Sequence, residues 1–205
     1  MEKCGSLEYA NAAKPFIVGL SGYAQTGKDT VAQILVQKYG YTRVSFADAL
    51  RTGLYKLNPI VDIDATIRDG YLVDVVPYRL ATIVNSIGWE RAKTEYSEVR
   101  ELLQRYGTEA GREIHGASCW IDIVKQQMAS NPSARYVISD IRFPNEYELL
   151  SQNQGISVRV VRDGVTAVNS HVSDSYVPEV NYTINNNGTK LDLEEEIEKV
   201  LGHIL

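Results

Sequence analysis

The chain has 205 residues, of which 44% are hydrophobic and 23% are charged. These proportions exclude extended disorder, and the length suits one compact domain at about 150 residues per domain. The net charge of −5, with Lys and Arg scattered along the chain, argues against a nucleic-acid polymer or an anionic membrane as a partner. No apolar run approaches the ~20 residues that span a bilayer, and no export signal is recognised, so we expect a cytoplasmic protein.

The first predicted elements are those of a parallel α/β fold. A short apolar run at 16–20 indicates a buried strand, a glycine-containing loop follows it, and helical spacing then runs through 29–39. The alternation repeats with a strand at 41–46 and a helix at 47–57, which an Asn-Pro pair ends. Strand, loop and helix in this order predict a parallel sheet.

The middle of the chain is predicted to be mainly helical. The pattern at 60–76 is ambiguous, whereas helical patterns dominate over 77–107 and a further helix is predicted at 119–129. We therefore expect a helical insertion over approximately 60–130, between the second and third strands of the sheet.

The last third of the chain returns to the α/β alternation. The predicted elements are strands at 135–140, 156–162 and 180–186, a short helix at 145–152, and an amphipathic closing helix at 190–205. With the first two strands this makes roughly five. We predict a single domain over 1–205, of the α/β class, with a parallel sheet of roughly five strands.

The loop after the first strand, Gly22-Tyr-Ala-Gln-Thr-Gly27-Lys28, fits the phosphate-loop pattern G-x-x-x-x-G-K. Its glycines allow backbone N–H groups to turn toward phosphate oxygens, the helix that follows adds the positive end of its dipole, and Lys28 supplies a cation. The pattern therefore predicts the binding of nucleotide phosphates. A structural glycine turn is the alternative.

The residues after Lys28 depart from the common pattern. A Ser or Thr usually follows the Lys and reaches Mg²⁺, but here Asp29 comes first and Thr30 second. Thr30 could hold the metal, directly or through water, whereas Asp29 could either contact the metal or only complement the helix dipole. The sequence leaves both interpretations open.

A second candidate site lies in the helical pattern over 97–113. Arg100, Gln104 and Gly107 recur there at i, i+4 and i+7, beside an apolar stripe. A cation, an amide and a gap on one face can bind a phosphate and a flat base edge together. The alternative is an ordinary solvated helix flank, which the spacing alone favours.

Three further candidates follow in the chain. Trp120 begins the next predicted helix, where spacing alone favours a core position over base stacking. Asp140 ends a predicted strand, at the edge where open α/β sheets bind ligands, and a carboxylate there can order a Mg²⁺ shell. Arg142 and Glu146 follow on the exit loop, and a structural Asp140–Arg142 ion pair is the alternative.

Together these motifs resemble the deoxynucleoside monophosphate kinases of tailed bacteriophages and their bacterial relatives. The segments that carry the resemblance are GYAQTGKDT (22–30), FADALR (46–51), VRELLQRYGTEAGR (99–112) and SDIRFPNE (139–146), with Trp120, and GWERAK (88–93), HVSD (171–174) and NNNGT (185–189) also fit. The ending GKDT belongs to this family, so Asp29 fits its pattern. The resemblance implies a P-loop NTPase fold of three α/β/α layers, and an insertion that binds the phosphate acceptor.

The resemblance also implies roles for individual residues. The phosphates of ATP would be bound by Gly22, Gln25, Thr26, Gly27, Lys28, Asp29 and Thr30. Mg²⁺ would be bound at Thr30. The acceptor, a deoxynucleoside monophosphate, would contact Ala24, Leu50, Arg51, Arg100, Gln104, Gly107, Thr108, Trp120, Asp140, Arg142 and Glu146. The catalytic candidates are Lys28, Asp140 and Arg142, and Arg159 or Arg162 would reach the donor.

Two other functions compete with this interpretation. One is a different small-molecule kinase with a phosphate loop, such as a dephospho-coenzyme A kinase, and the other is a nucleotide switch that hydrolyses ATP without an acceptor. The sequence leaves open which monophosphates are accepted and whether the chain forms a homodimer. If the chain is phage-encoded, the expected compartment is the host cytoplasm.

Overall fold

The computed structural model describes residues 17–69, 71–166 and 179–205. The chain divides into two compact units. The first unit contains the residues up to Val44 and those from Asn131 to Leu205, and the second is Ser45–Ser130. The predicted insertion over 60–130 thus corresponds to a unit that begins earlier, because helix α2 (Phe46–Leu57) packs against other helices of that unit.

The first unit is built on a five-stranded sheet. In spatial order its strands are β2 (Thr42–Val44), β5 (Tyr136–Ile138), β1 (Ile17–Ser21), β6 (Ile156–Val161) and β7 (Tyr182–Asn185). Every neighbouring pair is parallel. This confirms the predicted parallel sheet of about five strands, although β2 and β5 are shorter than predicted.

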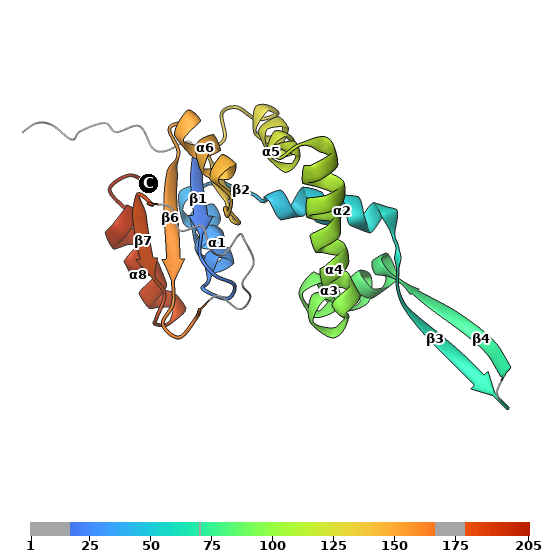
Figure 1. Cartoon of the computed structure of the whole chain (residues 1–205). Coiled ribbons are helices and arrows are strands. Elements are labelled where there is room, and N and C mark those ends of the chain that lie inside the picture. The colour runs from blue at the N-terminus through green and yellow to red at the C-terminus, as the bar shows by residue number, and fades with distance from the viewer. Residues whose placement is uncertain (1–16, 70, 167–178) are drawn as a thin grey trace, which may run out of the picture. The chain divides into compact units, whose positions relative to one another are not determined.

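Helices cover both faces of this sheet. Helices α1 (Lys28–Tyr39) and α8 (Lys190–Leu201) share a core with Leu20 of β1 on one face (Figure 1). The other face is covered by α6 (Pro144–Gln152), and Gly19 of β1 lies so close to it that a Cβ would fall 2.6 Å from a leucine side chain of this helix. The unit therefore has the predicted three α/β/α layers.

The second unit is mainly helical, as predicted. Its helices are α2, α3 (Leu80–Glu95), α4 (Ser97–Arg105), a π-helical segment η1 (Tyr106–Glu113) and α5 (Cys119–Ala129). Leu54, Leu80 and Val99 belong to the apolar core that joins α2, α3 and α4. Within the described parts of the chain, no helix is both long and apolar enough to cross a membrane.

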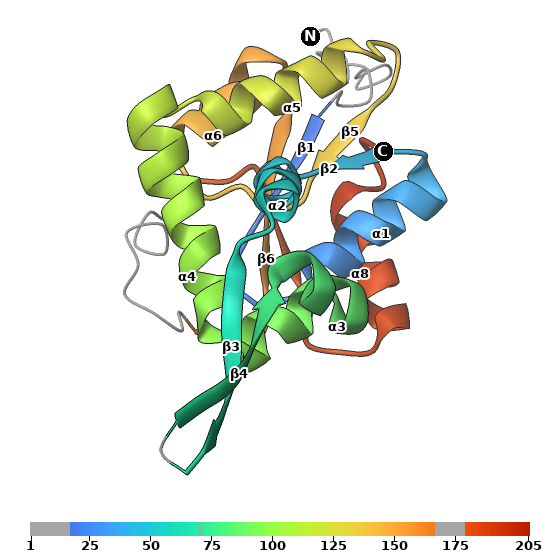
Figure 2. The same cartoon turned by 90° about the vertical axis from the view of Figure 1, so that its right-hand side faces the viewer.

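A long β-hairpin also belongs to the second unit (Figure 2). Its strands β3 (Ile60–Arg68) and β4 (Tyr71–Arg79) are antiparallel. The sequence pattern was ambiguous over 60–76, and the predicted helical start at residue 77 is wrong, because β4 continues to Arg79. The helix begins only at Leu80, where Asn58 Oδ1 accepts a hydrogen bond from the N–H of Ala81 at 2.9 Å and so satisfies one of the free donors at this helix end.

Candidate functional site

The glycine loop connects β1 to α1 and has a backbone that few residue types adopt. Gly22, Gln25 and Gly27 have φ angles of 133°, 67° and 100°. A Cβ at Gly22 would lie 2.3 Å from the carbonyl oxygen of Val160 in β6. Both the backbone angle and the close approach therefore demand glycine at position 22.

Asn186, which follows β7, holds the other end of this loop. Its side-chain amide donates a hydrogen bond to the main-chain oxygen of Thr26 at 2.8 Å, in a buried position. A Cβ at Gly27 would lie 2.2 Å from the same amide nitrogen. The loop is thus packed against a fixed donor, and the second glycine of the motif leaves the room that this donor needs.

The neighbouring asparagines bind two other segments. Asn185 donates to Glu196 of α8 at 3.3 Å, and the side chain of Asn187 accepts a hydrogen bond from the N–H of Asp163 at 2.8 Å. Three consecutive asparagines therefore join the end of β7 to α8, to the glycine loop and to the segment after β6. The sequence analysis did not predict that these side chains join the three segments. The run NNNGT (185–189) was the one sequence feature that pointed to this region.

Lys28 is the first residue of α1, and its side chain folds back over the loop. Its Nζ donates hydrogen bonds to the carbonyl oxygens of Gly22 at 2.8 Å and Tyr23 at 2.6 Å. The ammonium group therefore lies over the loop at the positive end of the α1 dipole. Thr26, predicted to contact phosphate, is buried, and its hydroxyl donates to the Tyr23 carbonyl at 3.0 Å.

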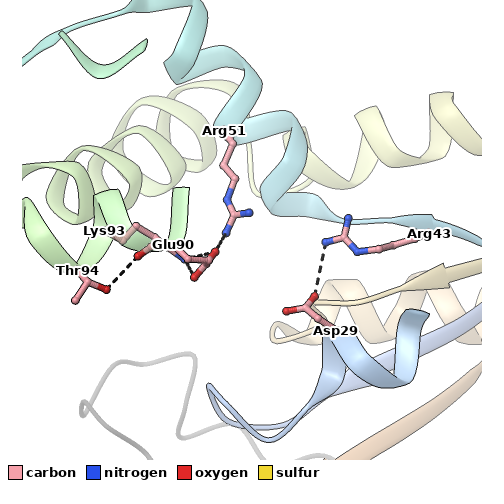
Figure 3. A network of polar contacts seen from close by, with 6 residues as sticks. All are labelled: Asp29, Arg43, Arg51, Glu90, Lys93 and Thr94. Atoms are coloured by element: carbon pink, nitrogen blue, oxygen red, sulfur yellow. Dashed lines mark hydrogen bonds and ion pairs between the residues drawn. The ribbon is translucent and has the colours of Figure 1, made fainter. Parts of the chain in front are cut away.

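Asp29 and Thr30 lie in the first turn of α1. The carboxylate of Asp29 is exposed and lies 3.8 Å from the guanidinium of Arg43, which the sequence did not single out (Figure 3). Among the described residues, no group of three or more His, Cys, Asp or Glu side chains could hold a metal ion. Mg²⁺ usually keeps several waters and binds substrate phosphates, and in phosphate-loop proteins a Ser or Thr hydroxyl near the loop Lys also contacts it. Thr30, in the first turn of α1, is a hydroxyl residue of this kind.

Asp140, Arg142 and Glu146 follow strand β5. Asp140 lies two residues beyond the end of this strand and is partly buried. Glu146 is only 2% exposed, and its Oε2 accepts hydrogen bonds from the N–H groups of Arg142 at 2.7 Å and Phe143 at 3.0 Å. Glu146 therefore fixes the loop on which Arg142 presents an exposed side chain.

The second unit positions Arg51 through an ion-pair network (Figure 3). The guanidinium of Arg51 lies 3.1 Å from Glu90 and 5.9 Å from the centre of the Trp89 ring. Lys93 binds the same carboxylate at 2.7 Å. Desolvation by burial would raise the pKa of Glu90, but Lys93 and Arg51 outweigh it and hold this pKa below its usual value. The carboxylate is therefore charged near neutral pH, and it holds Arg51 in place.

The predicted stripe of Arg100, Gln104 and Gly107 begins on α4 and continues into η1, where Thr108 follows it. Arg100, Gln104 and Thr108 are exposed, whereas Gly107 is buried. A Cβ at Gly107 would lie 2.5 Å from Leu50 Cδ1, so two residues predicted to share the acceptor pocket are in direct proximity.

Trp120 is part of the packing of the second unit. It is 8% exposed, its indole Nε1 donates to the carbonyl of Gly107 at 2.9 Å, and its ring lies 5.7 Å from that of Tyr106. A Cβ at Gly111 would lie 2.6 Å from the indole. This position supports the core function that the spacing favoured, and stacking on a nucleobase stays a prediction.

The predicted site residues thus fall into two groups. The first unit carries Gly22, Ala24, Gln25, Thr26, Gly27, Lys28, Asp29, Thr30, Asp140, Arg142, Glu146, Arg159 and Arg162. The second unit carries Leu50, Arg51, Arg100, Gln104, Gly107, Thr108 and Trp120. The HVSD segment, 171–174, lies outside the described residues. One unit therefore holds the phosphate loop, and the other holds the Arg, Gln and Gly stripe.

Comparison with known proteins assigns both units to one family. A model of the family described as deoxynucleotide monophosphate kinase matches residues 50–197, which is more than half of the chain. The glycine loop precedes the matched region. Its phosphate-loop character therefore rests on its own sequence and geometry.

Curated relatives give a consistent result. Deoxynucleoside-5'-monophosphate kinase of Escherichia phage T5 is 36% identical over 86 residues, which are 38% of this chain and 34% of that enzyme. A protein of Acanthamoeba polyphaga mimivirus with a provisional deoxynucleotide monophosphate kinase name is 25% identical over 77% of this chain and 80% of its own. UMP-CMP kinase of Xenopus tropicalis is 42% identical over 30% of this chain and 33% of its own.

Among solved structures, TT1252 from Thermus thermophilus aligns with 94% of this chain and 99% of its own. The sequence identity is 18% and the TM-score is 0.42. This likeness is too weak to support a conclusion about function.

Proposed function

Because the chain belongs to the deoxynucleotide monophosphate kinase family, we propose that it transfers the γ-phosphoryl group of ATP to a deoxynucleoside monophosphate. The products are ADP and the deoxynucleoside diphosphate. The observation that carries the donor half of this proposal is the glycine loop with Lys28 folded over it, at the start of α1. Such a loop suits a polyphosphate, because backbone N–H groups, a helix dipole and a cation converge on it.

The donor phosphates would bind at the glycine loop. Lys28 would exchange its carbonyl partners, Gly22 and Tyr23, for phosphate oxygens, and so place its charge where the transferred group becomes more negative. Mg²⁺, when bound, supplies further neutralisation of the phosphate charge. Thr30 is the residue that we propose to hold it, with Asp140 ordering its water shell.

The second unit carries arginines and an amide that suit the acceptor. Arg51 and Arg100 are proposed to hold the phosphate of the acceptor, and Gln104 the edge of its base. Arg142 of the first unit stays a predicted phosphate ligand. Arginine suits this function because its planar guanidinium binds phosphate through two parallel hydrogen bonds. Phosphoryl transfer requires positioning and charge neutralisation more than covalent catalysis, so these contacts are the main contribution of the protein.

A substrate panel tests this proposal against its two rivals. ADP release is measured in a coupled assay with ATP, Mg²⁺ and, in turn, each deoxynucleoside monophosphate, each ribonucleoside monophosphate and dephospho-coenzyme A. We expect at least one deoxynucleoside monophosphate to accelerate ADP release, and dephospho-coenzyme A to have no effect. Equal ADP release without any acceptor would instead support the nucleotide switch.

A further inference from the structure

Helix α3 is broken at Gly88. This residue has φ 77° and ψ 164°, a combination that residues other than glycine rarely adopt. A Cβ at Gly88 would meet no other atom within 4 Å, so the backbone angles, and not crowding, require glycine here. The break divides α3 into two helical pieces, and Trp89 and Glu90 are the first residues of the second piece.

These two consecutive residues contact the same guanidinium, that of Arg51 in α2. The carboxylate of Glu90 accepts a hydrogen bond from Arg51 Nη2 at 3.1 Å (Figure 3). The carbon of the guanidinium also lies over the Trp89 ring, 5.9 Å from its centre. Successive side chains of a regular α-helix point about 100° apart and do not normally face one partner. At the break, however, one residue offers a ring face to the guanidinium while the next binds one of its nitrogens.

Trp89 and Glu90 are themselves held in place. Trp89 packs against the apolar core that joins the helices of the second unit. Lys93, one turn after Glu90, binds the carboxylate of Glu90 at 2.7 Å. The side chains of Lys93 and Arg51 are only 24% and 27% exposed. Their ion pairs with Glu90 are therefore less screened by solvent than pairs between fully exposed side chains.

Lys93 also limits the repulsion that Glu90 would exert on a phosphate near Arg51. Because Lys93 and Glu90 carry opposite charges, the pair has no net charge, and the positive charge of Arg51 remains for an anion. Within the described residues, Arg51 makes one hydrogen bond, from Nη2 to Glu90. Most of its five N–H donors are therefore available to phosphate oxygens.

We propose that Trp89 and Glu90 are positioning residues for the phosphate of the acceptor, which act by holding the guanidinium of Arg51 in one orientation, and that the break at Gly88 allows both to reach it. The inference rests on the proposed function, in which Arg51 binds that phosphate. An unrestrained Arg side chain loses conformational entropy when it binds, and one that is already held in place loses less. The two residues therefore increase the affinity for the acceptor without contacting it.

The first test removes the carboxylate. Binding of dAMP, dCMP, dGMP and dTMP to the wild type, Glu90→Ala and Glu95→Ala is measured by calorimetry. For each monophosphate that the wild type binds, we expect Glu90→Ala to weaken binding about 2- to 10-fold. The kcat at a saturating acceptor concentration should stay unchanged. Glu95→Ala is the matched control and should bind normally, because Glu95 lies on the same helical piece but pairs with Arg91 at 2.7 Å.

A double-mutant cycle determines whether Glu90 acts through Arg51. Arg51→Ala should weaken monophosphate binding more than Glu90→Ala does, because it removes the phosphate ligand itself. In the Arg51→Ala background, Glu90→Ala should have no further effect. A general effect of Glu90 on the fold would instead lower the affinity by the same factor in both backgrounds. Circular dichroism and thermal melting establish that each variant is folded.

Gly88→Ala tests the break in α3. A Cβ at this φ strains the backbone, so the substitution should displace Trp89 and Glu90 and weaken monophosphate binding at least as much as Glu90→Ala. Gly164→Ala is the control, because Gly164 has a similar φ of 75°, meets no atom within 4 Å and lies in the first unit. The control should lower the melting temperature and leave monophosphate binding unchanged.

Several results would overturn the inference. They are an unchanged affinity in Glu90→Ala, an equal loss in the Arg51→Ala background, and normal binding by a folded Gly88→Ala variant. Tighter binding by Glu90→Ala would also overturn it, because Glu90 would then compete with phosphate for Arg51. A wild type that binds no monophosphate would contradict both the inference and the proposed function. Binding with the expected losses but without phosphoryl transfer would contradict the proposed function alone.

Discussion

The side chain of Asn186 donates a hydrogen bond to the main-chain oxygen of Thr26, a residue 160 positions earlier in the chain. The contact is 2.8 Å long and buried, and it lies against Gly27, where a Cβ would meet the same amide nitrogen. The phosphate loop is therefore held in shape by a residue that directly follows β7, the edge strand of the sheet. A loop of fixed shape presents its N–H groups to phosphate without first losing conformational entropy.

We expect Asn186→Ala to weaken ATP binding about tenfold while sparing the binding of the acceptor. The substitution leaves the Thr26 carbonyl without this buried donor, which typically costs about 1–3 kcal/mol. Titration of each nucleotide separately measures the two affinities. Asn185→Ala is the matched control, because Asn185 contacts Glu196 at the surface and should leave ATP binding unchanged. Equal effects on both nucleotides would indicate general destabilisation instead.

Lys28→Ala should abolish most phosphoryl transfer in a folded protein. The ammonium group is the cation that lies over the glycine loop, and removal of one such stabilising group typically lowers kcat about 100- to 1,000-fold. Steady-state kinetics measure the loss, and a thermal melt verifies the fold. Near-normal turnover in a folded variant would contradict the assignment of the phosphate loop.

Arg100→Ala and Gln104→Ala should raise the Michaelis constant of the acceptor and leave that of ATP unchanged. Both side chains are exposed on α4, beside the apolar core of their unit. Arg105→Ala is the control on the same helix, since Arg105 forms an exposed ion pair with Glu109, and exposed pairs contribute little. If ATP affinity fell and acceptor affinity persisted, the two pockets would have been assigned in reverse.

Trp120→Phe should lower the melting temperature, because it removes the donor that binds the buried carbonyl of Gly107, at a cost of about 1–3 kcal/mol. If the indole also contacts the acceptor base, the same substitution raises the Michaelis constant of the acceptor. Tyr136→Phe is the comparison, because it also removes a side-chain donor to a backbone carbonyl, that of Asn131, but in the first unit. Lower stability with unchanged acceptor affinity would restrict Trp120 to packing.

The architecture of the first unit could be predicted because its signals are local. Buried strands read as short apolar runs, and glycines mark the turn into α1, so the order of elements followed from the sequence. The hydrogen bond that fixes the shape of the glycine loop could not be predicted in this way. It depends on a contact between Asn186 and Thr26, and no local pattern relates two residues so far apart.

In the second unit, contacts between residues far apart in the chain determine more of the structure, so local patterns predicted it less well. The start of α3 is set by Asn58, which ends α2 with a φ of 49° and also accepts a hydrogen bond from Ala81. The helical pattern alone placed this start at residue 77. The π-helical segment η1 likewise depends on nonlocal contacts, since Trp120 binds the carbonyl of Gly107 and packs on Gly111.

The most direct test of the central claim follows the γ-phosphoryl group itself. The protein is incubated with ATP labelled at the γ-phosphorus, Mg²⁺ and the deoxynucleoside monophosphates, and the labelled products are separated by chromatography. We predict that the label appears in a deoxynucleoside diphosphate, in proportion to the ADP formed, and that Lys28→Ala prevents this. Label released only as inorganic phosphate, at the same rate with and without a monophosphate, would contradict the proposed kinase function.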